Sequence, residues 1–368
     1  MMRLTFAAIL LCSFGSLLAP PSTAQSAPGT LPQTTPARED PELKLRPPPS
    51  PEAEQVKEGH IHLDVVVADG AGKPVSGLER KDFSLLDDNR VQPILSFKAL
   101  DGASSASPVE VILLIDTVNT GTGQLGRIRE GIEKFLRQNN GKLAHPTSLF
   151  WFTDAGVKFQ PRPTTDGNAL ANLVHQIPPG VHTIPQAAGS EALLERLQLS
   201  VRTLSLIVNN ELKKPGRKLL IWTGPGWPLL SGESAVYSAR GHQLNFEAIL
   251  SLSNGLRQAR MEICSPGAGS EFYVRDFLKG VKTARNAGSG DLALQVLTVQ
   301  TGGITLDPGN GSRLVEEISE CAADAGAFYT LSFDPLKAGH PDEYHDLKVA
   351  IDRPGLKART STGYYNQP

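Results

Sequence analysis

The chain has 368 residues, of which 40% are hydrophobic and 20% charged, a composition that supports a packed core and excludes a globally disordered protein. Its 36 Lys and Arg side chains nearly balance 38 Asp and Glu, and the resulting net charge of -2 gives no indication of nucleic-acid binding. Three cysteines are too few for a disulfide-rich scaffold or a four-thiolate zinc site.

The first residues have the pattern of a secretory signal peptide. Arg3 precedes the largely apolar stretch 4–18, and Ser22-Thr23-Ala24 supplies small residues at a cleavage site. The stretch is interrupted by small polar residues and is shorter than the about 20 residues that span a bilayer. We therefore predict that residues 1–24 are a cleaved signal peptide, and that the mature protein is secreted or periplasmic with no transmembrane segment.

Residues 25–58 are rich in proline, glutamine, threonine and charged residues. Such a segment buries too little apolar surface to offset the entropy of ordering it, and its prolines favour extended conformations. We predict a disordered tether that holds the folded part away from a surface.

Short strands with a period of two residues are predicted at both ends of the remaining chain. They cover residues 61–67, 83–86, 91–97, 344–352 and 356–361. Neither end is long enough to bury a core alone. We therefore predict one small antiparallel β-domain built from residues 59–101 plus 342–368.

The central part of the chain, residues 105–336, alternates strands with helices. The predicted strands are residues 109–115, 148–152, 218–223, 261–264, 303–306 and 328–333, and the predicted helices lie near residues 125–136, 166–177, 191–209, 243–260, 292–300 and 312–322. This alternation indicates an α/β fold with a doubly wound, mostly parallel sheet.

Asp116 follows the first central strand and precedes Thr117-Val118-Asn119-Thr120. In a doubly wound sheet, ligands bind beyond the carboxyl ends of the strands, and oxygen ligands on such a loop suit a hard divalent cation. A second interpretation is open, in which the Asp116 carboxylate caps the helix or accepts hydrogen bonds from loop amides.

The loop from Leu114 to Thr120 resembles the first metal-site loop of von Willebrand factor type A (VWA) domains. Further segments resemble, in order, VWFA-related bacterial proteins of the Acidobacteria-type subgroup; they are residues 74–78, 82–83, 215–222, 301–303, 329–331, 353–357 and 363–365. The resemblance covers roughly residues 60–366. It implies a VWA-like α/β domain flanked by a small β-domain, and a role in binding rather than chemistry.

The sequence departs from the VWA metal-site pattern. Val118 replaces the first serine of the usual Asp-x-Ser-x-Ser loop, although Thr120 can supply the second hydroxyl. The second metal-site loop of VWA domains has a threonine, and Thr183 is the candidate for it. The third loop has an aspartate, and this sequence has Thr223-Gly224 there instead. One carboxylate with one or two hydroxyls is a poor Mg²⁺ site. We expect a degenerate site with no cofactor, or at most weak binding of Mg²⁺ or another divalent cation.

Two further features are each open to two interpretations. Trp227, among glycines and prolines, is either an exposed anchor for a partner or a ring packed under its loop. Cys264 and Cys321 are the thiols left after removal of the leader, and either pair in an oxidising compartment or pack as small apolar side chains.

An enzyme interpretation rests on Gly121-Thr122-Gly123-Gln124-Leu125-Gly126, which fits the dinucleotide-binding pattern G-x-G-x-x-G. Five residues separate the preceding strand from the first glycine, so the tight turn of that motif would be misplaced. Asp87-Asp88, which lie in a predicted turn, are interpreted as solvated surface rather than an acid/base pair.

We therefore expect an exported, non-enzymatic binding or adhesion module. Asp116, Asn119, Thr120 and Trp227 are predicted to face an unidentified protein partner at the cell envelope or outside the cell. The alternatives are a nucleotide-dependent oxidoreductase on a Rossmann-like sheet and a structural envelope component.

Overall fold

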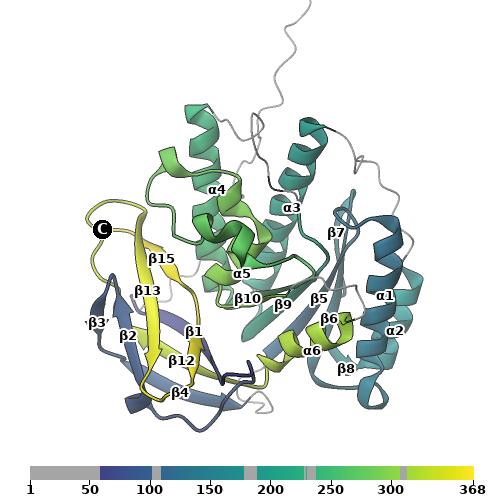
Figure 1. The fold of residues 1–368 in the computed structure, drawn as a ribbon, viewed down its shortest axis with the longest axis horizontal. Coiled ribbons are helices and arrows are strands. Elements are labelled where there is room, and N and C mark those ends of the chain that lie inside the picture. The colour runs from purple at the N-terminus through teal and green to yellow at the C-terminus, as the bar shows by residue number, and fades with distance from the viewer. Residues whose placement is uncertain (1–58, 102–108, 178–188, 228, 230–237, 307–312) are drawn as a thin grey trace, which may run out of the picture. The chain divides into compact units, whose positions relative to one another are not determined.

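The computed structural model describes residues 59–101, 109–177, 189–227, 229, 238–306 and 313–368 (Figure 1). The predicted signal peptide and tether (1–58) lie outside these described residues, as does Thr183. All the described residues belong to one compact unit. None of the described helices combines the length and the apolarity needed to cross a bilayer.

A seven-stranded sheet forms the centre of the fold. Its order is β11-β10-β9-β5-β6-β7, with β8 also paired to β6. Neighbours among β11, β10, β9, β5 and β6 are parallel, whereas β7 and β8 run antiparallel to β6. The sheet consists of β5 (Val109–Asp116), β6 (Lys142–Thr153), β7 (Gly156–Phe159), β8 (Thr164–Asp166), β9 (Arg217–Thr223), β10 (Met261–Pro266) and β11 (Thr305–Leu306). The predicted mixed α/β fold with a mostly parallel sheet is therefore confirmed.

The apolar run in β5 reflects its position between two strands and two helical layers. Both β6 and β9 pair with it, and its residues are buried except for the half-buried Glu110. Ile112 and Leu114 pack in one hydrophobic cluster, and Leu113 and Ile115 pack in the other. This alternation is typical of a strand that is covered on both faces.

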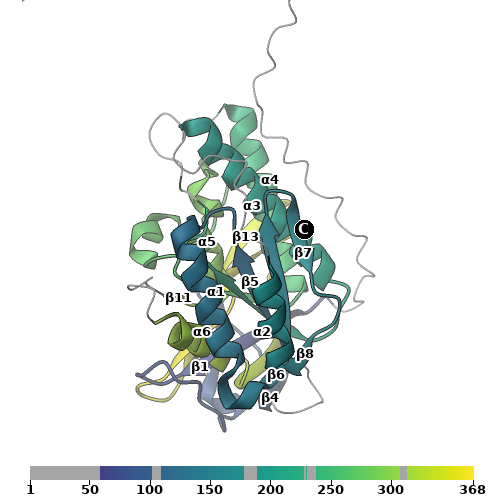
Figure 2. The same cartoon turned by 90° about the vertical axis from the view of Figure 1, so that its right-hand side faces the viewer.

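Helices cover both faces of the central sheet. One layer contains α3 (Ser190–Glu211), α4 (Ala239–Gln258) and α5 (Leu294–Gln300), and the other contains α1 (Thr122–Leu136), α2 (Gly167–Gln176) and α6 (Leu314–Ala323). Figure 2 shows α1 and α2 side by side over one face of the sheet. Asp166 caps α2, because its side chain accepts a 2.9 Å hydrogen bond from the backbone N–H of Ala169.

Two four-stranded sheets, at the lower left of Figure 1, form an antiparallel β-sandwich. One has the order β14-β1-β12-β4 and the other β15-β13-β2-β3. Their inward side chains share one hydrophobic cluster. The strands are β1 (Ile61–Ala68), β2 (Phe83–Asp87), β3 (Arg90–Gln92), β4 (Ser96–Asp101), β12 (Ala327–Phe333), β13 (Glu343–Ile351), β14 (Lys357–Arg359) and β15 (Gly363–Asn366).

We expected the strand at residues 328–333 to belong to the central sheet, and this prediction is wrong. The strand is β12, which pairs antiparallel with β1 and β4 in the sandwich. Its buried Tyr329, Leu331 and Phe333 face the sandwich core, while Phe328 packs toward the central sheet. An apolar run does not specify which of two adjacent sheets it joins, and this explains the misassignment. The domain division at 59–101 plus 342–368 and 105–336 remains a prediction.

Ion pairs join the sandwich to the central sheet. Arg260, which precedes β10, donates to Asp64 of β1 from Nε at 3.0 Å and from a terminal nitrogen at 2.5 Å. Arg359 of β14 donates to Asp324, which follows α6, at 2.7 Å. Each pair connects residues that are distant in sequence but neighbours in the fold.

Candidate functional site

Asp116 lies where the sequence placed it, at the carboxyl end of β5. This strand is central in the sheet, between β6 and β9, and the loop of residues 117–121 leads directly into α1. The Asp116 side chain is completely buried. The carboxyl edge of the sheet therefore carries a shielded carboxylate rather than an exposed one.

Four N–H groups of the protein surround the Asp116 carboxylate. Oδ1 accepts hydrogen bonds from the backbone N–H groups of Val118 at 3.0 Å and Asn119 at 2.9 Å. Oδ2 accepts from the Asn119 side-chain amide at 2.8 Å and from the Trp222 indole at 3.0 Å. Burial raises the pKa of Asp116, and these hydrogen bonds lower it in part. The geometry therefore agrees with the second interpretation of Asp116, in which its carboxylate accepts hydrogen bonds from loop amides.

Gly224 lies where the third metal-site loop of the VWA pattern has an aspartate. Its φ is +140°, and a Cβ there would lie 2.9 Å from Thr120 Oγ1 and 3.2 Å from the Asp116 Cβ. A side chain at this position would be strained and would crowd both residues. Within the described ranges, Asp116 belongs to no group of three acidic, histidine or cysteine side chains with converging ligand atoms.

The residues predicted to face a partner are buried. Thr120 is fully buried and Asn119 is 7% exposed. Trp227 is 4% exposed, donates its indole N–H to the Leu292 carbonyl at 2.9 Å, and lies edge-on to Trp222 with 5.3 Å between ring centroids. Of the two interpretations of Trp227, the structure has the second: the ring packs under its loop and is not an exposed anchor.

Two partners of the Asp116 loop were not predicted from the sequence. Trp222 lies in a predicted strand and Ser200 in a predicted helix, with no site role attached to either. Trp222 donates to Asp116, and the Ser200 hydroxyl accepts a 3.0 Å hydrogen bond from the Asn119 amide. A buried tryptophan needs an acceptor for its indole N–H, and this requirement was the one available signal. The serine carried no comparable signal.

The glycine pattern at residues 121–126 does not have the geometry of a pyrophosphate-binding turn. Gly121 is the N-cap of α1 with an ordinary φ of -63°, and α1 begins at Thr122. A Cβ added at Gly123 or Gly126 would meet no atom within 4 Å. Dinucleotide-binding glycines are required where the backbone approaches a phosphate or a strand closely, and these two positions are open.

Cys264 of β10 and Cys321 of α6 form a disulfide, with 5.8 Å between their Cα atoms. Both residues are completely buried. The bond therefore fastens α6 to the face of the central sheet that α6 covers.

The described surface has a groove away from Asp116. This groove, of about 600 Å³, lies where the central sheet meets the sandwich and is lined by β11, β13 and β14. Lys348, Arg359 and Thr360 are among its lining residues. Asp116 does not line it.

No family model matches this chain, and no curated protein matches it either. Solved structures with partial likeness include the human COPII-coat protein Sec24c (TM-score 0.36, 10% identity, 71% of this chain and 44% of that one). They also include the pilus adhesin SpaC from Lactobacillus rhamnosus GG in its open conformation (TM-score 0.35, 10% identity, 78% of this chain and 48% of that one). A third is proximal thread matrix protein 1 from the mussel byssus (TM-score 0.32, 11% identity, 59% of this chain and 48% of that one). The chain spans less than half the length of each. At these TM-scores the likeness identifies neither fold nor function.

Proposed function

We propose that the protein is an exported, non-enzymatic protein-binding module of the adhesion type. Its α/β part is a VWA-like domain whose metal site is degenerate, and its partner is a protein at the cell envelope or outside the cell. The disulfide supports export, because such bonds persist in oxidising compartments.

The degenerate metal site is supported by the donors around Asp116. A metal-binding carboxylate needs a free lone pair, whereas four N–H donors occupy the about four acceptor positions of the two Asp116 oxygens. A cation there would have to displace the Trp222 indole or the Asn119 amide from a buried position. Partner binding should therefore be independent of Mg²⁺ at Asp116.

The observation that carries the binding function is the exposure of two phenylalanine side chains in a segment that follows β10, at the carboxyl edge of the central sheet. The segment after β10 forms a 3-10 helix over Glu271–Phe277, in which Phe272 is 62% exposed and Phe277 is 37% exposed. The Arg275 guanidinium lies 5.0 Å from the centre of the Phe272 ring. Aromatic and arginine side chains are enriched in the contact residues that dominate protein interfaces.

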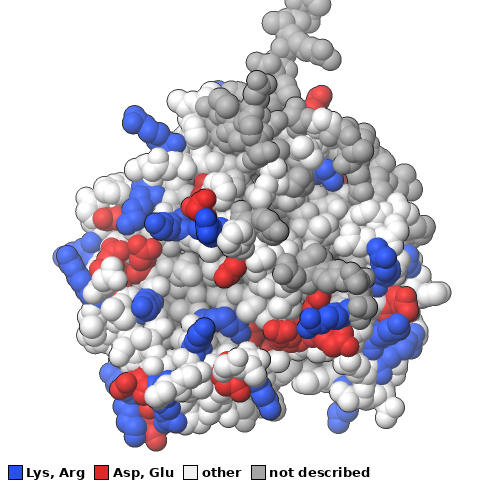
Figure 3. Space-filling model, in the orientation of Figure 1, with Lys and Arg blue, Asp and Glu red and all other residues white. Residues whose placement is uncertain are grey.

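This segment starts from the same edge as Asp116. It leaves the sheet at the carboxyl end of β10, where the Gly224 N–H approaches the Pro266 carbonyl at 3.5 Å. Loops at the carboxyl edge of an open α/β sheet are the usual location of binding sites. Basic and acidic side chains are intermixed on the face shown in Figure 3, and that pattern favours a protein over a polyanion as the partner.

The test is recovery of partners from an envelope extract on the immobilised mature chain. We expect the double variant Phe272→Ala/Phe277→Ala to lose a specific partner. The control Leu206→Ala, which removes a 44% exposed leucine from α3, should retain it. Recovery should be unchanged when EDTA replaces Mg²⁺. Equal recovery by both variants, or recovery that requires Mg²⁺, contradicts the proposal.

The same preparation tests the alternatives. Saturable NAD binding in calorimetry would favour the nucleotide-dependent oxidoreductase. Partner recovery that depends on β-sandwich substitutions, and not on Phe272, would favour a structural envelope component. Sequencing of the mature N-terminus tests export, because we expect the chain to begin at Gln25.

A further inference from the structure

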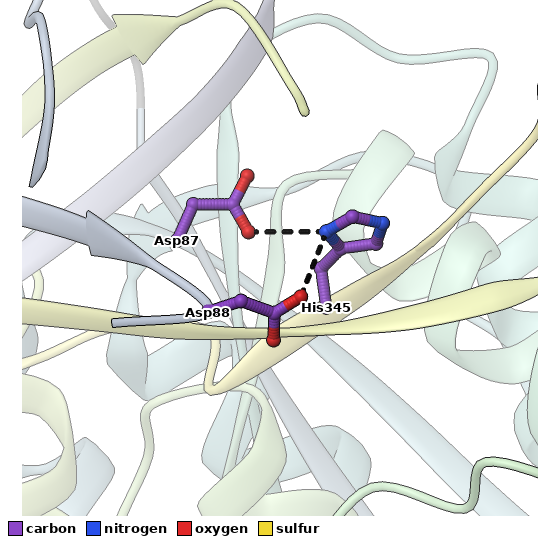
Figure 4. Close-up of side chains that lie close together, drawn as sticks. All are labelled: Asp87, Asp88 and His345. Atoms are coloured by element: carbon purple, nitrogen blue, oxygen red, sulfur yellow. Dashed lines mark hydrogen bonds and ion pairs between the residues drawn. The ribbon is translucent and has the colours of Figure 1, made fainter. Parts of the chain in front are cut away.

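Three side chains meet at the end of the β-sandwich, and the interpretation of Asp87-Asp88 as solvated surface is wrong for Asp87, which is completely buried. Asp87 is the last residue of β2, Asp88 begins the turn to β3, and His345 lies on β13 (Figure 4). Asp87 pairs with Leu347, so His345, two residues along β13, lies on the same face of the sheet. Asp88 adopts a φ of +45°, and the turn brings its carboxylate to the same point.

Both carboxylates approach the same nitrogen of the imidazole. His345 Nδ1 lies 3.2 Å from Asp87 Oδ1 and 3.2 Å from Asp88 Oδ2, and the three atoms lie within 4.8 Å of one another. Figure 4 shows the two carboxylates converging on Nδ1 from different directions. Asp87 is completely buried and His345 is 3% exposed.

The remaining oxygen of each carboxylate is already occupied. Asp87 Oδ2 accepts from the Tyr364 hydroxyl at 2.6 Å and from the Leu336 N–H at 3.2 Å. Asp88 Oδ1 accepts from the Asp346 N–H at 3.0 Å. An imidazole carries at most one hydrogen on Nδ1, so it cannot give a full hydrogen bond to both converging oxygens.

The other ring nitrogen of His345 is a separate observation that points to a ligand. Nε2 is buried and makes no hydrogen bond, and its closest acidic neighbour is Glu343 Oε2 at 4.0 Å. A histidine bound to a metal through Nδ1 carries its hydrogen on Nε2 and directs it at an outer carboxylate. Glu343 Oε2, which also accepts a hydrogen bond from the Gly339 N–H, is the carboxylate oxygen on that side of the ring.

We propose that Asp87, Asp88 and His345 bind one divalent transition-metal ion of the Zn²⁺ type. With metal–ligand distances of about 2.1 Å, the two 3.2 Å separations correspond to N–metal–O angles of about 100°, near the tetrahedral value. One imidazole and two carboxylates suit zinc better than Mg²⁺ or Ca²⁺, which prefer oxygen ligands throughout. The Asp88 side chain is 37% exposed, so solvent reaches the group at this residue.

The ion would join the β2–β3 turn to β13 and so hold one end of the sandwich together. This site is independent of Asp116, which lies in the central sheet. The assignment therefore stands apart from the proposed partner-binding function.

Calorimetric titration of the untagged mature chain with ZnCl₂ tests the site. We expect one saturable site per chain in the wild type, and binding at least about tenfold weaker in Asp88→Asn. Asp88 is the suitable ligand to change because it is partly exposed, and asparagine keeps the acceptor for the Asp346 N–H. The matched control is Asp342→Asn, at another turn aspartate with a positive φ of 58°, which should bind Zn²⁺ as the wild type does.

Titration with Co²⁺ provides a second measurement that does not depend on the variant's stability. A bound Co²⁺ with one nitrogen and two oxygen ligands should give visible absorption bands, and Zn²⁺ should abolish them by competition. Absence of saturable binding in the wild type overturns the proposal. Undiminished binding in Asp88→Asn, or equal weakening in both variants, overturns it as well.

Discussion

The indole N–H of Trp222 donates to Asp116 Oδ2 across 3.0 Å, between two neighbouring parallel strands. Asp116 ends β5 and Trp222 lies near the end of β9, so the bond closes the carboxyl edge of the sheet at its centre. It places a fixed protein donor beside the oxygen that a metal-binding aspartate would offer to a cation. The edge is therefore held together by hydrogen bonds between side chains.

Replacing Trp222 with phenylalanine should destabilise the protein by about 2–4 kcal/mol, because a buried carboxylate loses a donor and the smaller ring leaves a gap. Trp227→Phe is the matched control, since it loses a bond to an uncharged carbonyl at a comparably buried site. We expect Trp222→Phe to cost more than the control by about 1 kcal/mol in urea unfolding at pH 7.

The excess cost of Trp222→Phe should depend on pH. Burial raises the pKa of Asp116 in the folded state, and the indole bond opposes that rise. Removing the bond raises the folded pKa further, so stability is lost as the pH increases above the usual carboxyl range. The difference between the two variants should therefore be smaller at pH 4 than at pH 7. A difference that does not change with pH would show that packing, and not the charge of Asp116, accounts for it.

The period of the sequence predicted the buried strands β5, β6, β9 and β10 and the helices that cover them, because each is buried on a face that its own residues reveal. It did not predict β7 or β8, and it placed the strand at residues 328–333 in the wrong sheet. The same period also applies to Asp87. Phe83, Leu85 and Asp87 alternate on the buried face of β2, so the two-residue period placed this carboxylate inside. Its position in a predicted turn favoured the wrong interpretation.

Contacts between distant segments could not be predicted in this way. Asp64 is on the more polar side of β1, as alternation requires, but its partner Arg260 is separated from it by 196 residues. The indole that donates to Asp116 likewise belongs to Trp222, which is 106 residues away in sequence. Local periodicity determines which face a side chain occupies, whereas the partner on that face depends on the tertiary arrangement.

The ion pair of Asp64 and Arg260 should contribute measurably to stability. It is bidentate and partly buried, with the two side chains 12% and 30% exposed, and Thr330 Oγ1 adds a 3.0 Å hydrogen bond to Asp64. A double-mutant cycle with Asp64→Asn and Arg260→Gln should give a coupling energy of about 1–2 kcal/mol. A coupling energy near zero in urea unfolding would show that water replaces the pair at no cost.

Loss of the disulfide should destabilise the protein strongly. Cys264 and Cys321 are 57 residues apart, and closing a loop of that length lowers the entropy of the unfolded chain by the equivalent of about 4 kcal/mol. The double variant Cys264→Ala/Cys321→Ala should lose up to that amount of unfolding free energy. Reduction of the wild type should produce the same loss and add the mass of two hydrogen atoms. An intact mass that reduction leaves unchanged would show that the thiols are not paired in solution.

Ionisation of Asp291 should make the free energy of unfolding depend on pH. This residue precedes α5, is 5% exposed, and accepts a 2.8 Å hydrogen bond from the Gly288 N–H. Burial outweighs the backbone hydrogen bonds from Gly288 and from Asp291 itself, and it raises the pKa of Asp291 to about 6. The folded state thus holds the proton more tightly than the unfolded chain does. The contribution of Asp291 to stability is complete below the usual carboxyl pKa and is lost as the pH rises from about 4 to about 6.

Asp291→Asn removes this charge and keeps an oxygen that can accept the hydrogen bond from Gly288. We expect the variant to exceed the wild type in unfolding free energy by about 2–3 kcal/mol at pH 8 and to match it near pH 4. Asp276→Asn is the control, because the Asp276 side chain is 90% exposed and its charge carries no burial cost. Urea unfolding at both pH values measures the two differences. A gain for Asp291→Asn that is equal at pH 4 and pH 8 would mean that the amide packs better than the carboxyl, and that ionisation of Asp291 does not limit stability.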